Sequence, residues 1–307
     1  YFFKYGLFEE DNSELVINLI KSAVYSFDSP KLDVEINNII SSLIKTIENC
    51  SDGINKKIND NSKFNYASYC LQLLHNLLSM FGECLQTKSP VFSQSLIDQN
   101  FHSILCQIPN KISPIDNQLK LDVINDILYI ICGMTKGNDE IKKRFIGQMK
   151  KQKLAQFLNS IEIDEKTIQY LLLLIFEKEI DLTQNNSVDI KFNKALPFLH
   201  TALLNKKQYD QIFLLIYEIT TKSFTNKIQI YKSKLLNLFI VEIQKYPLID
   251  QISIEKLATL DIMFNIFQTV TSSLAKPQTL LEVLKALQKK DNKERPWYVS
   301  QFIKIFN

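Results

Sequence analysis

Apolar residues recur along nearly the whole chain with the spacing of an α-helix, and this periodicity constrains the fold more than any other feature. One clear stripe consists of Ile168, Leu171, Leu172, Ile175 and Phe176. A second stripe of the same spacing consists of Ile36, Ile39, Ile40, Leu43 and Ile47. No comparable run alternates with the period of two that marks a half-buried β-strand. The sequence therefore predicts an all-α protein.

Glycine is scarce, with six residues among 307, whereas 46% of the residues are apolar. The apolar content is sufficient for a core of ordinary size. The shortage of glycine leaves little material for a Rossmann turn, a phosphate-binding loop or a β-sandwich with many turns. We expect a single helical-repeat domain over residues 1–307. Because the chain begins with Tyr1 instead of methionine, we also expect it to be a segment of a longer protein.

Start and stop signals allow individual helices to be placed. The dipeptides Ser29-Pro30, Ser89-Pro90 and Ser113-Pro114 each put a capping hydroxyl before a proline at the first helical position. Gly82 and Gly133 follow apolar stripes where a left-handed cap would fall, so we expect helices to end there. About fourteen helices result, at 12–27, 30–49, 63–81, 90–107, 114–132, 138–148, 151–160, 165–179, 189–205, 208–222, 225–245, 254–273, 278–290 and 296–306.

The helix spacing indicates stacked repeats. Fourteen helices in this chain give about 44 residues per antiparallel pair, within the ~40–47 residue period of armadillo and HEAT units. A tetratricopeptide period of ~34 residues fits less well. A helix pair with a wide apolar stripe buries that stripe only against its sequence neighbours. The whole chain thus resembles the armadillo/HEAT class in its periodicity, and this resemblance implies a right-handed α-solenoid of antiparallel helix pairs.

The cysteines and the apolar runs bear on the compartment. Five cysteines lie among apolar residues without any CxxC pair: Cys50, Cys70, Cys84, Cys106 and Cys132. We expect small buried thiols in a reducing compartment, and hence an intracellular protein in cytoplasm or nucleus. The longest nearly apolar stretch is 168–176, whereas a helix that crosses a bilayer needs roughly 20 apolar residues. No membrane span is expected.

The sequence offers no catalytic or metal-binding motif. His75, His102 and His200 lie far apart, and none belongs to an HExxH or has a cysteine two or three residues away. No GxSxG, SxxK or glycine-rich loop is present. Cys70 and His75 lie on different faces of one predicted helix, so we expect both to serve in packing. We assign no catalytic residue, metal or cofactor, and expect this segment not to be an enzyme.

The best electrostatic candidate is a basic stretch with apolar residues between its charges. It consists of Lys142, Lys143, Arg144, Lys150, Lys151 and Lys153. Such a patch can attract an acidic peptide, a phosphoinositide headgroup or nucleic-acid phosphate. The alternative is a solvated helix face, because lysine pervades the chain. Only Arg144 and Arg295 could grip a phosphate with two hydrogen bonds, so we expect no specific nucleic-acid partner.

A second candidate surface is the aromatic tail formed by Trp297, Tyr298 and Phe302. Tryptophan is frequent in the energetically dominant part of protein interfaces. A terminal helix that stacks on a further repeat would present the same residues. We favour the stacking interpretation.

Both ends of the chain carry a further resemblance. The opening Tyr1-Phe2-Phe3-Lys4-Tyr5, followed by Leu15, Ile17, Leu19, Ile20 and Ala23, and the ending Arg295-Pro296-Trp297-Tyr298-Val299 resemble the helical flanks of very large ubiquitin carboxyl-terminal hydrolases. This resemblance implies a non-catalytic arm of a deubiquitinase, because neither the cysteine box nor the histidine box of that family is visible.

Four functional hypotheses remain open, of which a free-standing all-α enzyme with a cluster of perturbed pKa values in a closed pocket comes last. The first is a scaffold that binds a protein or peptide partner along a superhelix. The second is the deubiquitinase arm, and the third is polyanion or membrane-surface binding through the basic stretch. The oligomeric state is left open.

Overall fold

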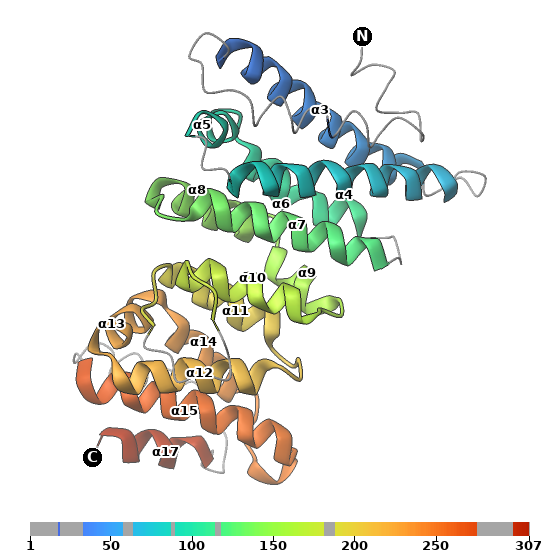
Figure 1. Ribbon diagram of the computed structural model, residues 1–307. Coiled ribbons are helices and arrows are strands. Elements are labelled where there is room, and N and C mark those ends of the chain that lie inside the picture. The colour runs from blue at the N-terminus through green and yellow to red at the C-terminus, as the bar shows by residue number, and fades with distance from the viewer. Residues whose placement is uncertain are drawn as a thin grey trace. The chain divides into compact units, whose positions relative to one another are not determined.

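The computed structural model describes residue 18 and residues 33–57, 64–86, 90–113, 118–180, 188–274 and 297–306. Every regular element in these ranges is a helix, and none of them contains a strand (Figure 1). The predicted all-α class is therefore confirmed. The predicted helices 12–27 and 278–290 lie outside the described residues, apart from residue 18, which is helical.

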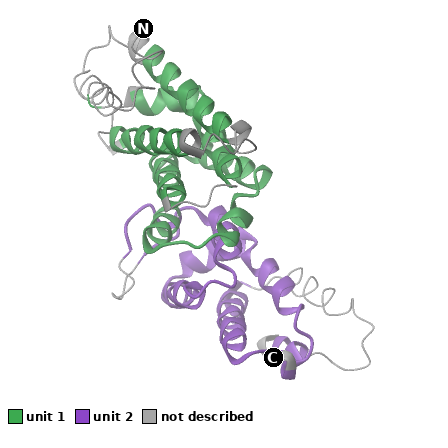
Figure 2. Ribbon diagram, turned by 90° about the vertical axis from the view of Figure 1, so that its right-hand side faces the viewer, with its two compact units in different colours: residues 1–174 green, residues 175–307 purple. Residues whose placement is uncertain are grey.

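The contacts divide the chain into two compact units, residues 1–174 and 175–307 (Figure 2). Unit 1 contains helices α3 (Asp33–Lys57), α4 (Phe64–Gln86), α5 (Pro90–Asp98), α6 (Phe101–Ile112), α7 (Gln118–Thr135), α8 (Asp139–Lys151), α9 (Leu154–Ser160) and most of α10 (Glu165–Phe176). Helix α4 packs between α3 and α7, while α6 packs against α3, α8 and α9. The apolar stripes of these helices face inward and form one buried core.

Unit 2 contains the 3₁₀ turns η3 (Asn193–Ala195) and η4 (Ile249–Gln251), and helices α11 (Leu196–Leu203), α12 (Tyr209–Lys222), α13 (Phe224–Ser233), α14 (Leu235–Ile243), α15 (Ile254–Leu274) and α17 (Trp297–Phe306). Helix α15 contacts α12, α13, α14 and α17 and is therefore central to the unit. Tyr209 stacks on Phe213 at 4.2 Å between ring centroids, and the Phe239 ring meets Phe213 edge-on. These buried rings contribute much of the apolar surface of the core.

Two predicted helices are each divided in two by a single residue with left-handed backbone. The helix expected at 90–107 breaks at Asn100, whose φ is 53°, and becomes α5 and α6. The helix expected at 225–245 breaks at Lys234, whose φ is 69°, and becomes α13 and α14. Periodicity continues across both breaks, and neither residue is a glycine. The helical pattern therefore gave no sign of them.

The expected helix ends at Gly82 and Gly133 are wrong, because α4 continues to Gln86 and α7 to Thr135. Both glycines lie instead where these two helices touch. A Cβ atom on Gly82 would lie 2.7 Å from Cδ1 of Tyr129, and one on Gly133 would lie 3.3 Å from Cδ1 of Leu85. The glycines thus permit a close helix–helix approach and do not cap either helix.

Other local signals agree with the structure. Helix α5 begins at Pro90 as expected. Pro197 lies in the first turn of α11, so that helix starts after Ala195 and is not kinked. Ser113 follows the end of α6, residues 114–117 are not described, and α7 is described from Gln118. The five cysteines are buried, as their apolar surroundings indicated. Within the described residues, no helix is long and apolar enough to cross a membrane.

We expect Gly82→Ala to lower the free energy of unfolding by about 1–3 kcal/mol, because its Cβ would overlap the Tyr129 ring between α4 and α7. Gly147→Ala is the matched control, since a Cβ atom there has no other atom within 4 Å. It should raise stability by about 0.5–1 kcal/mol through helix propensity alone. Chemical denaturation measures both values. Equal effects of the two substitutions would contradict the close contact.

Candidate functional site

Helix α8 carries most of the predicted basic stretch, and its sequence explains why it is helical. The side-chain oxygen of Asn138 accepts the N–H of Ile141 at 3.1 Å and caps the helix. Asp139 and Glu140 lie in the first turn, and Lys150 and Lys151 in the last, so both pairs oppose the helix dipole. The apolar stripe of α8, formed by Ile141, Phe145 and Met149, is buried.

Five of the six basic residues lie on α8, and they occupy two sides of that helix. Lys143, Arg144, Lys150 and Lys151 are exposed, and Lys153 is exposed in the link to α9 with a φ of 53°. Lys142 is only 7% exposed, and its Nζ lies 3.3 Å from Oδ1 of Asp139. Including Lys142 in the surface patch was therefore wrong. Residue 142 lies on the same side of the helix as Phe145 and Met149, which face the core.

Four of the exposed cations surround an exposed glycine. Lys143 and Arg144 precede Gly147 by four and three residues, and Lys150 and Lys151 follow it by three and four. Residues at these spacings are neighbours on a helix surface. Gly147 is itself exposed and lies opposite the buried stripe of α8. We call these five residues the α8 cationic face.

The aromatic tail packs inside unit 2. Tyr298 and Phe302 are 2% and 1% exposed, and the Phe302 ring lies 5.1 Å from that of Phe264 on α15. The indole Nε1 of Trp297 donates to the backbone oxygen of Tyr246 at 2.8 Å. The prediction of an exposed stacking end is therefore wrong for Tyr298 and Phe302, because both side chains are buried and Phe302 packs on Phe264 and Phe267 of α15.

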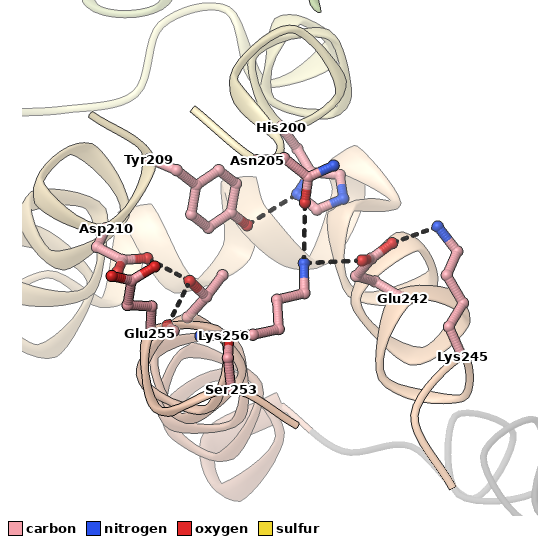
Figure 3. Close-up of polar contacts among 10 residues, drawn as sticks. His200, Asn205, Tyr209, Asp210, Glu242, Lys245, Ser253, Glu255 and Lys256 are labelled. Atoms are coloured by element: carbon pink, nitrogen blue, oxygen red, sulfur yellow. Dashed lines mark hydrogen bonds and ion pairs between the residues drawn. The ribbon is translucent and has the colours of Figure 1, made fainter. Parts of the chain in front are cut away.

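A charged network lies between α14 and α15 in unit 2 (Figure 3). The carboxylate of Glu242, whose side chain is 4% exposed, accepts from Nζ of Lys245 at 2.5 Å and from Nζ of Lys256 at 3.0 Å. Lys256 also donates to Oδ1 of Asn205 at 3.2 Å. Its Nζ lies 5.3 Å from the centre of the Tyr246 ring. Two cations thus compensate the buried charge of Glu242, and its ion pair with Lys256 joins α14 to α15.

A second buried polar contact in unit 2 joins two helices through a histidine. Nδ1 of His200 and the hydroxyl of Tyr209 form a hydrogen bond of 2.9 Å (Figure 3). Burial lowers the pKa of His200 to about 4 and raises that of Tyr209 well above its ordinary value. Both side chains are therefore neutral near pH 7. This pair stabilises the packing of α11 on α12 and is sealed from solvent.

Unit 1 contains a histidine–carboxylate pair that sequence reasoning missed. Nδ1 of His75 on α4 lies 2.6 Å from a carboxylate oxygen of Asp126 on α7. The hydrogen bond to Asp126 raises the pKa of His75, although partial burial opposes it, while burial raises the pKa of Asp126. The two residues are 51 positions apart, so no local spacing could reveal them. His75 forms a specific polar contact in addition to the packing role expected of it.

A second polar cluster in unit 1 links α7 to the start of α10. Asn125 donates to the carboxylate of Asp164 at 3.1 Å, and the backbone N–H of Thr167 donates to the same carboxylate at 2.7 Å. These hydrogen bonds lower the pKa of Asp164, although burial alone would raise it. The Asp164–Thr167 spacing is that of an ordinary N-cap and was recognisable in the sequence. Its partner on α7 was not.

Side chains that could bind a metal ion are dispersed among the described residues. No group of three or more histidine, cysteine or acidic side chains among them is placed to hold a metal ion. Burial raises the pKa of the Cys106 thiol to about 12, so this thiol is protonated and inert near pH 7. The titratable groups described above bond to one another across helix pairs. What the surface offers is charge on α8 and scattered apolar residues in unit 2, namely Leu214, Phe224, Val241, Leu248, Ile249 and Ile254.

No model of a known protein family matches the chain, and no curated protein matches it either.

His75 and His200 should titrate differently. We expect the pKa of His75 to lie above 6.5 because Asp126 stabilises its protonated form, and that of His200 to lie near 4 because it is buried. Asp126→Asn should lower the pKa of His75 and leave that of His200 unchanged. Histidine ring signals followed by NMR across pH give these values. A pKa of 6.5 or below for His75 in the parent would rule out the pair.

Glu242→Gln should lower the free energy of unfolding by about 2–4 kcal/mol near pH 7, because Lys256 then keeps a buried charge without its carboxylate. Burial alone would raise the pKa of Glu242, but the two lysines together lower it below 4.5. The contribution of the carboxylate is thus present above pH 4.5 and is lost as pH falls through the lowered pKa. Denaturation of parent and variant at several pH values tests this.

The matched control is Glu218→Gln, which removes an exposed carboxylate from α12. We expect it to change stability by less than about 0.5 kcal/mol at any of these pH values. If the difference between parent and Glu242→Gln persisted unchanged well below pH 4.5, the charge network would not be its cause.

Proposed function

We propose that the chain is a non-catalytic scaffold for protein–protein interactions, built as a right-handed α-solenoid of antiparallel helix pairs of the armadillo/HEAT type. The observation that supports it best is the locality of helix packing inside each unit. Helix α4 packs between α3 and α7, and α15 packs on α12 and α17. Helices that bury their stripes mainly against others no more than three helices away in the chain leave long outer faces available to partners.

The fate of the polar groups supports a non-catalytic role. Glu242, His200 and His75 are each bonded to a side chain of another helix or turn. A general acid or base must instead reach a substrate proton from an accessible position. A role in holding helices together accounts for all three.

Small-angle X-ray scattering tests the proposed solenoid. A compact domain of this length would have a radius of gyration of about 19 Å. We expect a clearly larger value, because a stacked superhelix is elongated. A monomer with a radius near 19 Å would contradict the solenoid and favour a globular helical bundle.

Reconstitution tests the scaffold role. The purified chain should retain a protein partner at low and at high salt, and the identified partner should then form a stoichiometric complex with the chain in calorimetry. The matched control is the chain with Leu172→Ala and Phe176→Ala, which removes two buried side chains of α10 and should destabilise the fold. Failure to reconstitute any stoichiometric complex would count against the scaffold.

The likeness to deubiquitinase flanks gives a second proposal, in which the same scaffold is an arm of a larger enzyme. It depends on residues 1–23 and 295–299, and of these only residue 18 and residues 297–299 are described. The coding sequence on both sides decides it. A cysteine box and a histidine box in the same reading frame would support the arm, and their absence would refute it.

A further inference from the structure

The fold supplies no reason for a glycine at position 147. Its φ is not left-handed, and a Cβ atom there would meet no atom within 4 Å. Glycine inside a helix destabilises it relative to alanine. Two other glycines inside helices, Gly82 and Gly133, are explained by their contacts with Tyr129 and Leu85. Gly147 therefore leaves helix backbone uncovered on an exposed surface, at a cost that no internal contact offsets.

The uncovered backbone lies in the middle of the α8 cationic face. Lys143 and Lys150 lie on one side of it along the helix, and Arg144 and Lys151 on the other. Among the described residues, Arg144 pairs with Glu140, whereas no ion pair is found for Lys143, Lys150 or Lys151. The exposed side chains of Lys143, Lys150 and Lys151 thus surround the part of the helix surface where Gly147 carries no side chain.

We propose that this face binds an acidic α-helix of a partner protein, packed closely over Gly147 with its carboxylates on Lys143, Lys150 and Lys151. The proposal rests on the scaffold function and names the class of partner. Lys143 and Lys150 are seven residues apart, or about 10.5 Å along the axis, which is also the spacing of carboxylates at positions i and i+7 of another helix. Because Gly147 has no side chain, the axes of α8 and the partner helix can approach to about 8 Å, the short end of the usual range of distances between packed helices.

The charge pattern favours a protein over nucleic acid or a lipid surface. Asp139 and Glu140 are exposed at the N-terminal end of the same helix, where a uniform polyanion would be repelled. Arg144 already pairs with Glu140, so its guanidinium group is not free to form bidentate hydrogen bonds with a phosphate. A partner helix can place a cation opposite Asp139 and Glu140, and carboxylates opposite the lysines.

The probe is a synthetic alanine-rich helical peptide with glutamates at i, i+4 and i+7 of one face, and its control has glutamine at the same positions. Binding to the full 307-residue chain is followed by fluorescence anisotropy at low salt. The variant Lys143→Gln/Lys150→Gln should weaken binding about fivefold to tenfold, because two exposed ion pairs are lost. The control variant Lys45→Gln/Lys136→Gln removes the same charge from exposed sites elsewhere in unit 1 and should leave binding within about twofold.

A size series at position 147 tests the close approach. Gly147→Gln should keep the helix intact, because its side chain enters open space, yet it should weaken peptide binding at least as much as the double lysine variant. Gly147→Ala should have a smaller effect. If Gly147→Gln bound as well as the parent, attraction at a distance would explain binding and the helix-on-helix geometry would be refuted.

Further outcomes of these binding experiments distinguish a failure of the acidic-helix proposal from a failure of the scaffold function. Preferential binding of phosphatidylserine vesicles or a DNA duplex, with no binding of the glutamate peptide, would overturn the acidic-helix proposal. Equal losses in the double lysine variant and its control would do the same. A stoichiometric protein partner that binds the parent and the Lys143→Gln/Lys150→Gln variant alike would preserve the scaffold and place its contact elsewhere.

Discussion

The close contact between α4 and α7 is the constraint on which the rest of unit 1 depends. Gly82 on α4 accommodates the Tyr129 ring, and Gly133 on α7 accommodates Leu85, so each helix supplies a glycine opposite a large side chain of the other. Close packing of this kind fixes the helices in register. That register brings His75 within hydrogen-bonding distance of Asp126, and it gives α7 the position from which Asn125 reaches Asp164.

In unit 2, an ion pair and aromatic contacts determine how the helices pack on one another. Helix α15 is held to α14 through Lys256 and Glu242, and to α17 through the rings of Phe264 and Phe302. A buried carboxylate that loses its cations is left as an uncompensated charge, so arrangements of α14 and α15 that separate Glu242 from Lys256 are disfavoured. The buried polar groups of unit 2 therefore help to specify how its helices pair.

Local patterns in the sequence predicted what depends on local structure. Period and capping residues were sufficient for the all-α class, for the start of α5 at Pro90 and for the burial of all five cysteines. They failed where the decisive neighbour was distant in the chain. The sequence alone predicts a helix end at Gly82, because the contact of Gly82 with Tyr129 on another helix is not visible in it. It also predicts Lys142 at the surface, because it does not reveal which side of α8 faces the core. The basic character of α8 was evident in the sequence, but the uncovered backbone at its centre required the structure.

The left-handed residues Asn100, Lys153 and Lys234 each turn the chain from one helix into the next within one or two positions. Connections of one or two residues cannot absorb an inserted or deleted residue. An inserted or deleted residue in an ordinary loop is absorbed by the loop, whereas at these corners it would rotate the following helix by about 100° and turn its apolar stripe away from the core. Length variation in this protein should therefore be confined to its longer connections, while the three corners keep a constant length.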